Sequence, residues 1–533
     1  MSVSAFPGHN LNGVASTGKG IVAAGHPATA QAAADILREG GNAFDAVLAA
    51  LLASCVAEPV LASLGGGGFL LARTAIQPPQ LYDFFTQTPS LKRPRSEVDF
   101  FPILADFGTA QQEFHIGMGA IASPGVIRGL FEIHRNLCRM PLTTIIQPAC
   151  AMARAGVPVN PFQHYIAEIV SPILLSTSGA LDLHQSPARP GTLAAVGEPV
   201  PQPQMADAFD ILAREGEALF YEGEMGEALL QDSKSHGGHL RREDLAGYRI
   251  ARRIPLELRY HQFHLYTNPP PSIGGTLIAF TLALLEQEQL GNHQEGDADH
   301  LLKIAHAQRL TQQLRHDQQI EQDLNAQTAA RILGNDILQQ YRRSMRNHPT
   351  CSRGTTQISI ADHSGNLASM TLSNGEGSGY VIPGTGIMMN NMLGEEDISP
   401  HGFHLWPEDR RIASMMSPTL VLAEDGRAVV TGSGGSNRIR SAILQVLINL
   451  LDFHMTIDDA VEHSRIHFEG ELLNVETGFN EVTLDRLFDN FPRHRLWPDK
   501  NLFFGGAHTV AREANGRLTG KGDSRRGGIA IAS

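Results

Sequence analysis

The last third of the chain is a series of short apolar or alternating segments, each followed by residues that favour tight turns. After residue 354 these segments read TTQISIAD, LASMTLSN, GIMMNNML, SPTLVLAED and AVVTGSGGS. Short strands joined by glycine turns pair with their sequence neighbours, so this region predicts a sheet built from hairpins. The helix-like segment RSAILQVLINLLDFH follows them. Any fold for this chain must therefore bury a sheet formed largely by its C-terminal third.

The first of these segments alternates in character. Thr356, Ile358 and Ile360 are expected on one face, and the residues between them, beginning with Thr355, are polar. This pattern is typical of a strand in a half-buried sheet. A strand can begin with two threonines for structural reasons alone, so the pattern leaves a functional role for Thr355 open.

The N-terminal part is helical in character. Residues 27–58 show a long helix pattern that is interrupted at EGGNAFD. Gly40 and Gly41 suit the end of one helix, and Asn42 suits the start of the next.

Composition and charge exclude several classes of protein. Hydrophobic residues make up 42% of the 533 residues and charged residues 18%, which is typical of a compact globular protein and not of a disordered one. The formal net charge is -13. Binding to phosphates needs a concentrated basic surface, so we expect neither a nucleic acid nor an anionic membrane as a partner.

The cysteines and the N-terminus favour a reducing compartment. The four cysteines, in a chain of this length, form no disulfide framework. The N-terminal residues lack a basic start followed by an apolar segment, so we expect no secretory signal. The longest apolar stretch, Ala46 to Ala57, is too short to cross a bilayer. These features predict a soluble, cytoplasmic protein, unless a signal has been removed from the sequence.

Several common motifs are incomplete or absent. The glycine run at residues 65–68 lacks the Lys-Ser/Thr ending of a phosphate-binding loop. The pairs His261/His264 and His401/His404 have no clear third metal ligand. No G-x-S-x-G motif is present. We therefore expect no cofactor, no metal and no serine-hydrolase elbow.

Thr355 and its neighbours fit a different chemistry. A threonine hydroxyl is a weak nucleophile, and an N-terminal threonine carries a base in its own α-amine. That amine titrates near pH 7.7 to 8.0, which suits proton transfer at neutral pH. Cleavage between Gly354 and Thr355 would create such a residue. Glycine before the cut can adopt the strained turn that attack on its carbonyl requires.

The segment TGSGGSN, residues 431–437, is a candidate oxyanion hole. Acyl transfer needs donors aimed at the developing negative charge, and successive backbone amides in a glycine turn supply them. The same sequence also fits an ordinary tight turn.

Motifs along nearly the whole chain carry a family resemblance. They are GGNAFDAV, LGGGGFLL, SPGVIRGL, PPPSIGGT, GTTQISIADHSGNLASMT, GIMMNNML, SMMSPTLVL and TGSGGSNRI. In this order they resemble the γ-glutamyltransferase (γ-glutamyltranspeptidase) family, N-terminal-nucleophile hydrolases that cut themselves into two subunits. The resemblance implies an α+β fold, a four-layer αββα sandwich. It also implies an α-rich large subunit, residues 1–354, and a small subunit, residues 355–533, intertwined as one catalytic heterodimer.

The resemblance also implies roles for individual residues. Thr355 would be the nucleophile, Ser373 would orient it, and the amides of Gly435 and Ser436 would form the oxyanion hole. Asn374 and Glu395 would hold the α-amine of the donor. A slip of one residue would exchange Glu395 for Glu396.

Some positions depart from the family pattern. Phe85 stands where the family has an arginine for the donor's α-carboxylate, and the Ser-Ser pair for the same group reads Ser414-Met415. Gln357 replaces a histidine, and Met392 replaces a polar residue. Loss of the arginine removes a bidentate contact that other residues do not imitate. The changes predict a less polar donor pocket.

Three hypotheses about function follow. The first is an autoprocessing γ-glutamyltransferase-like enzyme, in which Thr355 attacks glutathione or another small γ-glutamyl amide and the acyl-enzyme is resolved by water or an amine. The second is an amidase with the same machinery but another acyl group, as in the related cephalosporin acylases; Phe85 and Met415 favour it. The third is an uncleaved, non-catalytic binding protein.

Overall fold

The computed structural model describes residues 14–16, 18–106, 111–320, 324–343, 355–396 and 402–533. The chain forms a mixed α/β structure with two seven-stranded sheets, and neighbouring strands within both are antiparallel. Gly354, the residue before the predicted cut, lies outside the described residues.

The first sheet, called sheet A here, has the strand order β1-β20-β19-β15-β14-β11-β10. Its strands are β1 (Val14–Ser16), β20 (Leu518–Lys521), β19 (Thr509–Arg512), β15 (Ala428–Thr431), β14 (Thr419–Leu422), β11 (Phe263–Thr267) and β10 (Leu256–Tyr260).

The second sheet, sheet B, has the strand order β21-β2-β12-β13-β3-β4-β9. Its strands are β21 (Ile529–Ala532), β2 (Gly20–Ala24), β12 (Thr356–Asp362), β13 (Leu367–Ser373), β3 (Gly67–Arg73), β4 (Gln80–Asp83) and β9 (Ala251–Arg253). The hairpins β12-β13 and β14-β15 confirm the local pairing predicted from the glycine turns. Both sheets also combine strands from before and after residue 354, so the two parts of the chain are interleaved.

The alternation predicted for β12 is present, but the prediction of a half-buried strand was wrong. All seven residues of β12 are buried. Ile358 and Ile360 join the hydrophobic cluster that contains helices α1 (Pro27–Arg38) and α2 (Ala43–Ala57). The opposite face of β12 packs against β15 and β19 of sheet A. Its polar residues are therefore buried between two sheets instead of facing water.

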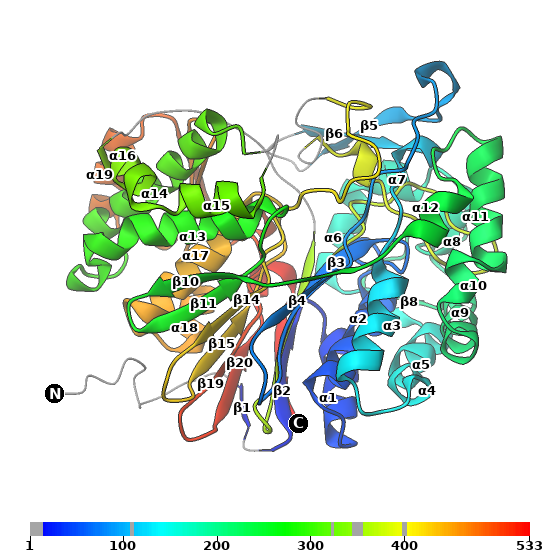
Figure 1. Ribbon diagram of the computed structural model, residues 1–533, viewed down its shortest axis with the longest axis horizontal. Helices are drawn as coiled ribbons and strands as arrows, with labels where there is room; N and C mark the ends of the chain where they lie inside the picture. The colour runs from blue at the N-terminus through cyan, green and yellow to red at the C-terminus, as the bar shows by residue number, and fades with distance from the viewer. Residues whose placement is uncertain (1–13, 17, 107–110, 321–323, 344–354, 397–401) are drawn as a thin grey trace.

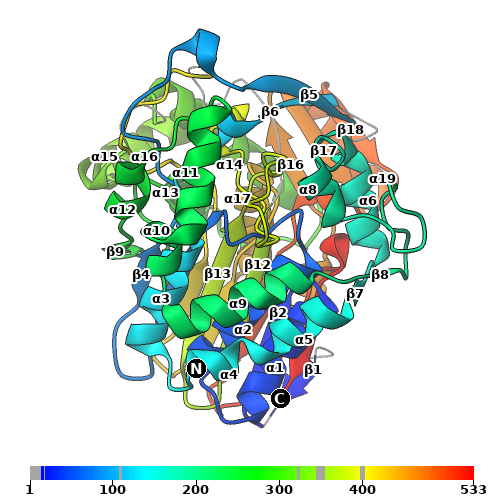
Figure 2. The same cartoon turned by 90° about the vertical axis from the view of Figure 1, so that its right-hand side faces the viewer.

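The helix break predicted near Gly40 is confirmed. Gly40 adopts a φ of 98° between α1 and α2. Asn42 then caps α2 by accepting hydrogen bonds from the amides of Phe44 and Asp45. Every residue of α2 is buried, because α2 lies between sheet B on one side and further helices on the other. Figure 2 shows α2 and α9 (Pro203–Glu215) in front of β2, β12 and β13.

Helices also cover the outer face of sheet A. α13 (Ile273–Leu285) is buried throughout and contacts α14 (Ala298–Asp317) and α17 (Arg438–Leu451). Figure 1 shows these helices above sheet A, with α1 and α2 on the far side of sheet B. α17 is the helix predicted after the glycine turn.

Further elements surround this core. They are α3 (Val126–Leu137), α5 (Gln147–Ala155), α6 (Pro161–Ile169), α11 (Glu224–Ser235), α15 (Ala326–Ile332), α16 (Asn335–Arg343), α18 (Ile457–Glu462), α19 (Glu481–Asn490), β5 (Phe101–Asp106), β6 (Gln111–Ile116), β16 (Ile466–Glu469), β17 (Leu472–Glu476) and β18 (His494–Trp497). Among the described residues, no helix has the length and apolar character needed to cross a membrane. Cys55, Cys138 and Cys150 are free thiols.

Candidate active site

Thr355 lies directly before β12 and is 4% exposed. Thr356 pairs with Leu372 in the antiparallel ladder of β12 and β13. One step further along this register places Thr355 beside Ser373, where facing side chains are in contact range. The hydroxyl of Ser373 accepts a hydrogen bond of 3.1 Å from the amide of Gly375. The structure therefore brings together two residues to which the sequence assigned a shared role.

The glycine turn between β15 and α17 packs against Thr355. A Cβ atom on Gly434 would lie 1.8 Å from the carbonyl oxygen of Thr355, so only glycine fits there. Gly435 and Ser436 adopt positive φ values of 121° and 50°. The turn leads into the N-terminus of α17, whose amides and dipole favour negative charge. This position and polarity suit an oxyanion site beside Thr355.

A buried polar network lies along the same face of β12. Gln357 donates from Nε2 to the hydroxyls of Ser359 and Ser369 at 3.1 and 3.0 Å, and its Oε1 accepts from Thr371 at 2.6 Å. Ser369 in turn donates to the carbonyl of Thr431 in sheet A. Gln357 therefore joins the two sheets below the glycine turn. A buried network with every member satisfied makes this region rigid.

Glu58 is a site residue that the sequence analysis missed. It follows the last residue of α2 and is fully buried. Its two carboxylate oxygens accept hydrogen bonds from Thr29 at 2.8 Å and Thr356 at 2.7 Å. Burial raises the pKa of the Glu58 carboxyl, and the two hydroxyl donors oppose that shift. The sequence showed Glu58 only as the polar end of an apolar helix.

Arg526 and His508 were also missed. Nη1 of Arg526 donates to the carbonyl oxygen of Thr355 at 3.2 Å, and burial lowers the pKa of this guanidinium to about 10. His508 is 1% exposed, and burial lowers the pKa of its imidazole to about 4. A Cβ on Gly25 would touch Glu58, Thr356 and His508. No periodic or spacing signal in the sequence connects these residues with Thr355.

The predicted amine-binding residues lie just beyond Ser373. Asn374 is fully buried, and neither polar atom of its side chain has a hydrogen-bond partner within the described residues. Glu395 is 7% exposed, whereas Glu396 is exposed. A Cβ on Gly375 would lie 2.2 Å from Oε1 of Glu395, so this carboxylate faces the turn after β13. Of the two neighbouring acids, Glu395 is the one buried beside this turn.

Phe85 and Thr355 belong to one row of residues that lie side by side across neighbouring segments of sheet B, called the cross-strand row here. Ser373 pairs with Gly67, and the backbones of Gly68 and Phe84 hydrogen-bond to each other, so the next step places Gly67 beside Phe85. A Cβ on Gly67 would be 3.0 Å from the Cα of Phe85. Phe85 is 2% exposed and stacks on Phe69 at 5.3 Å between ring centroids. At the position where the resemblance implies an arginine, this row therefore contains an aromatic ring.

Two further departures from the family pattern, Met392 and Met415, are apolar, whereas Gln357 is polar. Met392 and Met415 are buried in the same hydrophobic cluster as Phe85. Ser414 is buried; its hydroxyl accepts from the amide of Met416, and its carbonyl accepts from Ser272 at 2.7 Å. These contacts tie Ser414 to the start of α13.

Arg411 lies near Phe85 but is engaged elsewhere. It donates to the carbonyl of Phe85, to the hydroxyl of Tyr248 and to the carbonyl of Arg249. Its Nε is also 3.5 Å from the carboxylate of Asp83. With these contacts the guanidinium fastens its segment to β4 and does not replace the arginine missing at Phe85.

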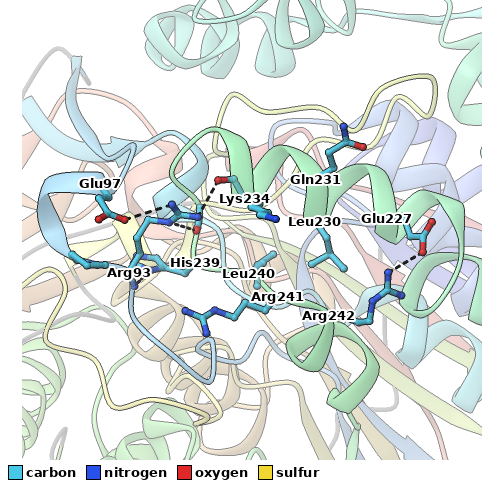
Figure 3. A pocket seen from close by; sticks show the side chains of 12 residues that line it. Arg93, Glu97, Glu227, Leu230, Gln231, Lys234, His239, Leu240, Arg241 and Arg242 are labelled. Carbon is cyan, nitrogen blue, oxygen red and sulfur yellow. Dashed lines mark hydrogen bonds and ion pairs between the residues drawn. The ribbon is translucent and has the colours of Figure 1, made fainter.

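Other features of the molecule lie apart from these residues. A cavity of about 940 Å³ lies beside α11. Figure 3 shows side chains that line it, among them Arg93, Lys234, His239 and Arg241. None of the predicted site residues lines it. Within the described residues, no group of three His, Cys, Asp or Glu side chains is placed to hold a metal. His261 and His264 contact Asp452 and Glu257, and His401 lies outside the described residues.

Known proteins resemble this chain along nearly its whole length. The chain is 29% identical to the acylase ACY 1 proenzyme of Pseudomonas sp. (strain SE83), over 97% of this chain and 94% of that protein. It is 28% identical to the glutathione hydrolase proenzyme of Escherichia coli (strain K12), over 95% of this chain and 90% of that protein.

A solved structure has the same fold. Cephalosporin acylase from Bacillus halodurans superposes with a TM-score of 0.85 at 23% identity, covering 100% of this chain and 98% of that chain. A family profile described as Gamma-glutamyltranspeptidase matches residues 29–533. The chain therefore belongs to the γ-glutamyltranspeptidase family.

Proposed function

We propose that this protein is a self-cleaving threonine amidase or acyltransferase with Thr355 as its nucleophile. The observation that carries the proposal is the packing of Thr355 between Ser373 and the glycine turn of Gly434 and Gly435. An acyl transfer site needs a nucleophile, a group that orients it and donors for the oxyanion within one small space.

The first reaction would be self-cleavage. The Thr355 hydroxyl attacks the carbonyl carbon of Gly354, the peptide nitrogen leaves, and an ester forms between the two residues. The departing nitrogen takes a proton and becomes the α-amine of Thr355, and water then hydrolyses the ester, which frees the carboxylate of Gly354 and the hydroxyl of Thr355. The products would be the large subunit, residues 1–354, and the small subunit, residues 355–533, held together as one αββα unit by the interleaved strands of both sheets.

The second reaction would be turnover of an amide. The α-amine of Thr355 takes the proton from its own hydroxyl while the oxygen attacks the substrate carbonyl. The amides of Gly435 and Ser436 hold the oxyanion. The C–N bond then breaks, and the amine leaves with the proton. Water or an amine acceptor attacks the resulting ester and restores Thr355.

Phe85, in the cross-strand row of Thr355, favours an acyl donor without a free α-carboxylate. Phe85 occupies the position at which an arginine is expected, and Met392 and Met415 extend the same apolar cluster. Arg411 does not compensate, because its donors are used by Phe85, Tyr248 and Arg249. This arrangement supports an acylase-type amidase as the first candidate.

The polar residues beyond Ser373 favour γ-glutamyl donors as the second candidate. The buried amide of Asn374 has both polar atoms unpartnered in the described part of the chain, and the carboxylate of Glu395 lies beside the same turn. A buried unsatisfied amide is costly unless a ligand satisfies it. An α-amino group on the substrate would meet both residues.

Two measurements test the proposal. Intact mass of the purified protein should give fragments corresponding to residues 1–354 and 355–533, and Thr355→Ala should remain a single chain. Release of p-nitroaniline then compares three donors: a γ-glutamyl anilide, a glutaryl anilide, which lacks only the α-amino group, and a butyryl anilide, which lacks both the α-amino and the α-carboxylate groups. A wild-type chain that stays uncut after long incubation would contradict the proposal and favour a non-catalytic binding protein.

A further inference from the structure

Arg526 is a buried arginine in direct contact with the residue proposed as the nucleophile. It ends the short helix η8 (Ser524–Arg526), between strands β20 and β21, and is 4% exposed. Nη1 donates to the carbonyl of Thr355 at 3.2 Å, and Nη2 donates to the carbonyl of Leu502 at 3.3 Å. The guanidinium thus reaches Thr355 from a part of the chain 171 residues away.

The glycine turn makes room for this side chain. A Cβ on Gly434 would lie 3.2 Å from Nη1 of Arg526, and a Cβ on Gly435 would lie 3.2 Å from Nη2. A Cβ on Gly506 would lie 2.6 Å from the Cδ of Arg526. The three glycines therefore form a cradle around the stem and head of one arginine. Its positive charge lies against the turn whose amides are proposed to hold the oxyanion.

Within the described residues, Arg526 forms no ion pair with a carboxylate that would account for its burial. Its neighbour Arg525 is equally buried, but Arg525 pairs with Glu476 at 2.6 Å and with Asp523 at 3.2 Å. In the described part of the chain the hydrogen bonds of Arg526 end on carbonyl oxygens, and its Nε has no partner. A buried cation that lacks a contacting carboxylate is unfavourable for folding.

Among the described residues, Glu376, Asp523, Glu58 and His508 act electrostatically on Arg526. Burial lowers the pKa of Arg526, and the attraction of Glu376, Asp523 and Glu58, largest for Glu376, only partly opposes this shift. His508 carries no charge near neutral pH, because burial lowers its pKa to about 4. Glu58 is already hydrogen-bonded to two threonines, and Asp523 to Arg465 and Arg525.

We infer that Arg526 is a positioning residue for the reaction of Thr355. Its guanidinium holds the Thr355 carbonyl in place and keeps a fixed positive charge at the glycine turn. This inference rests on the proposed function. A cation here favours the negative oxyanion of the transition state, and it also favours the neutral, basic form of the Thr355 α-amine over the ammonium form.

The test compares Arg526→Met and Arg526→Lys with wild type, on the enzyme after self-cleavage. The Met variant removes the charge and keeps an apolar stem, so we expect an unchanged or higher melting temperature. We expect its kcat to fall by about 100-fold, with a much smaller change in KM. The acidic limb of kcat/KM against pH should move to higher pH, because loss of the cation raises the pKa of the α-amine.

The Lys variant keeps a cation and should leave the acidic limb in the wild-type position, with part of kcat restored. Arg525→Lys is the matched control: we expect it to lower the melting temperature without moving the acidic limb. If Arg526→Met retains the wild-type kcat and the wild-type position of the acidic limb, the inference is wrong. If Arg526→Met does not fold, the Lys variant tests the inference instead. An unchanged kcat in Arg526→Lys would show that the guanidinium contact with Thr355 does not matter for the reaction.

The two proposals fail in different ways. A wild-type protein that neither cleaves itself nor releases amine from any amide refutes the proposed function. A wild-type protein that does both, together with an Arg526→Met variant of unchanged kcat and pH profile, refutes only the role of Arg526.

Discussion

The hydroxyl of Thr356 donates a hydrogen bond of 2.7 Å to the buried carboxylate of Glu58, although the two residues are 298 positions apart in the chain. This contact joins the C-terminal end of α2 to the start of β12, directly after the proposed nucleophile. Thr29 donates to the second oxygen of the same carboxylate at 2.8 Å. The start of β12 is therefore held from the helical side of sheet B, while Gly434 and Arg526 hold Thr355 itself.

Glu58 should make the stability of the protein depend on pH. Burial raises its pKa in the folded state, so the folded chain retains this proton more strongly than the unfolded chain does. The stabilisation is complete below the pKa of an exposed carboxyl, about 4.3, and is lost as the pH rises through the raised value. We expect the free energy of unfolding of wild type, relative to Glu58→Gln, to fall between pH 4.5 and 8. Urea unfolding of both proteins at several pH values measures this difference in free energy.

A Glu58→Gln difference that stays constant over the same pH range would show that the Glu58 carboxyl has the same pKa in the folded and the unfolded chain.

Gly434→Ala should prevent Thr355 from taking its native position. The added methyl group would lie 1.8 Å from the Thr355 carbonyl oxygen. We expect a loss of about 1–3 kcal/mol in the free energy of unfolding and little or no self-cleavage. Gly247→Ala is the control, because a Cβ at Gly247 meets nothing within 4 Å. Equal stability and equal cleavage in the two variants would contradict the contact.

Ser373 should act through its hydroxyl. Its position beside Thr355 and its 3.1 Å hydrogen bond from the Gly375 amide predict that it fixes the nucleophile. We expect Ser373→Ala to lower kcat by about 100-fold with a smaller change in KM, since misplacement of a reacting group has effects of this size. Ser373→Thr keeps the hydroxyl and should retain most of the activity. Steady-state kinetics on the better anilide substrate measures both variants. Equal losses of kcat in Ser373→Ala and Ser373→Thr would indicate that Ser373 contributes only through packing.

Glu395 and Glu396 form a natural matched pair for testing donor recognition. Glu395 is buried beside Gly375, whereas the next residue is exposed. For a donor with a free α-amino group, Glu395→Gln should raise KM by about 10-fold, because a charged hydrogen bond is lost. Glu396→Gln should leave KM unchanged. If Glu395→Gln changes KM equally for donors with and without the α-amino group, then Glu395 does not bind that group of the donor.

Local patterns in the sequence determined much of the architecture. The break between two helices at Gly40 and Asn42, the hairpin of β12 and β13, and the helix after the glycine turn all lie where they were expected. Each depends on residues close together in sequence, whose periodicity and capping are legible without the rest of the chain. The same patterns predicted a half-exposed β12, because nothing local signals that a second sheet covers its polar face.

The sequence by itself determined the helices and the hairpins, and its family motifs predicted Thr355, Ser373 and the glycine turn as site residues. Only the tertiary structure decided that Phe85 shares a cross-strand row with Thr355, that Glu58 supports Thr356, and that Arg526 reaches the Thr355 carbonyl. The physical reason is that these contacts join segments far apart in sequence. Their geometry depends on strand register and on the packing of two sheets, and neither leaves a periodic signal in the local residues.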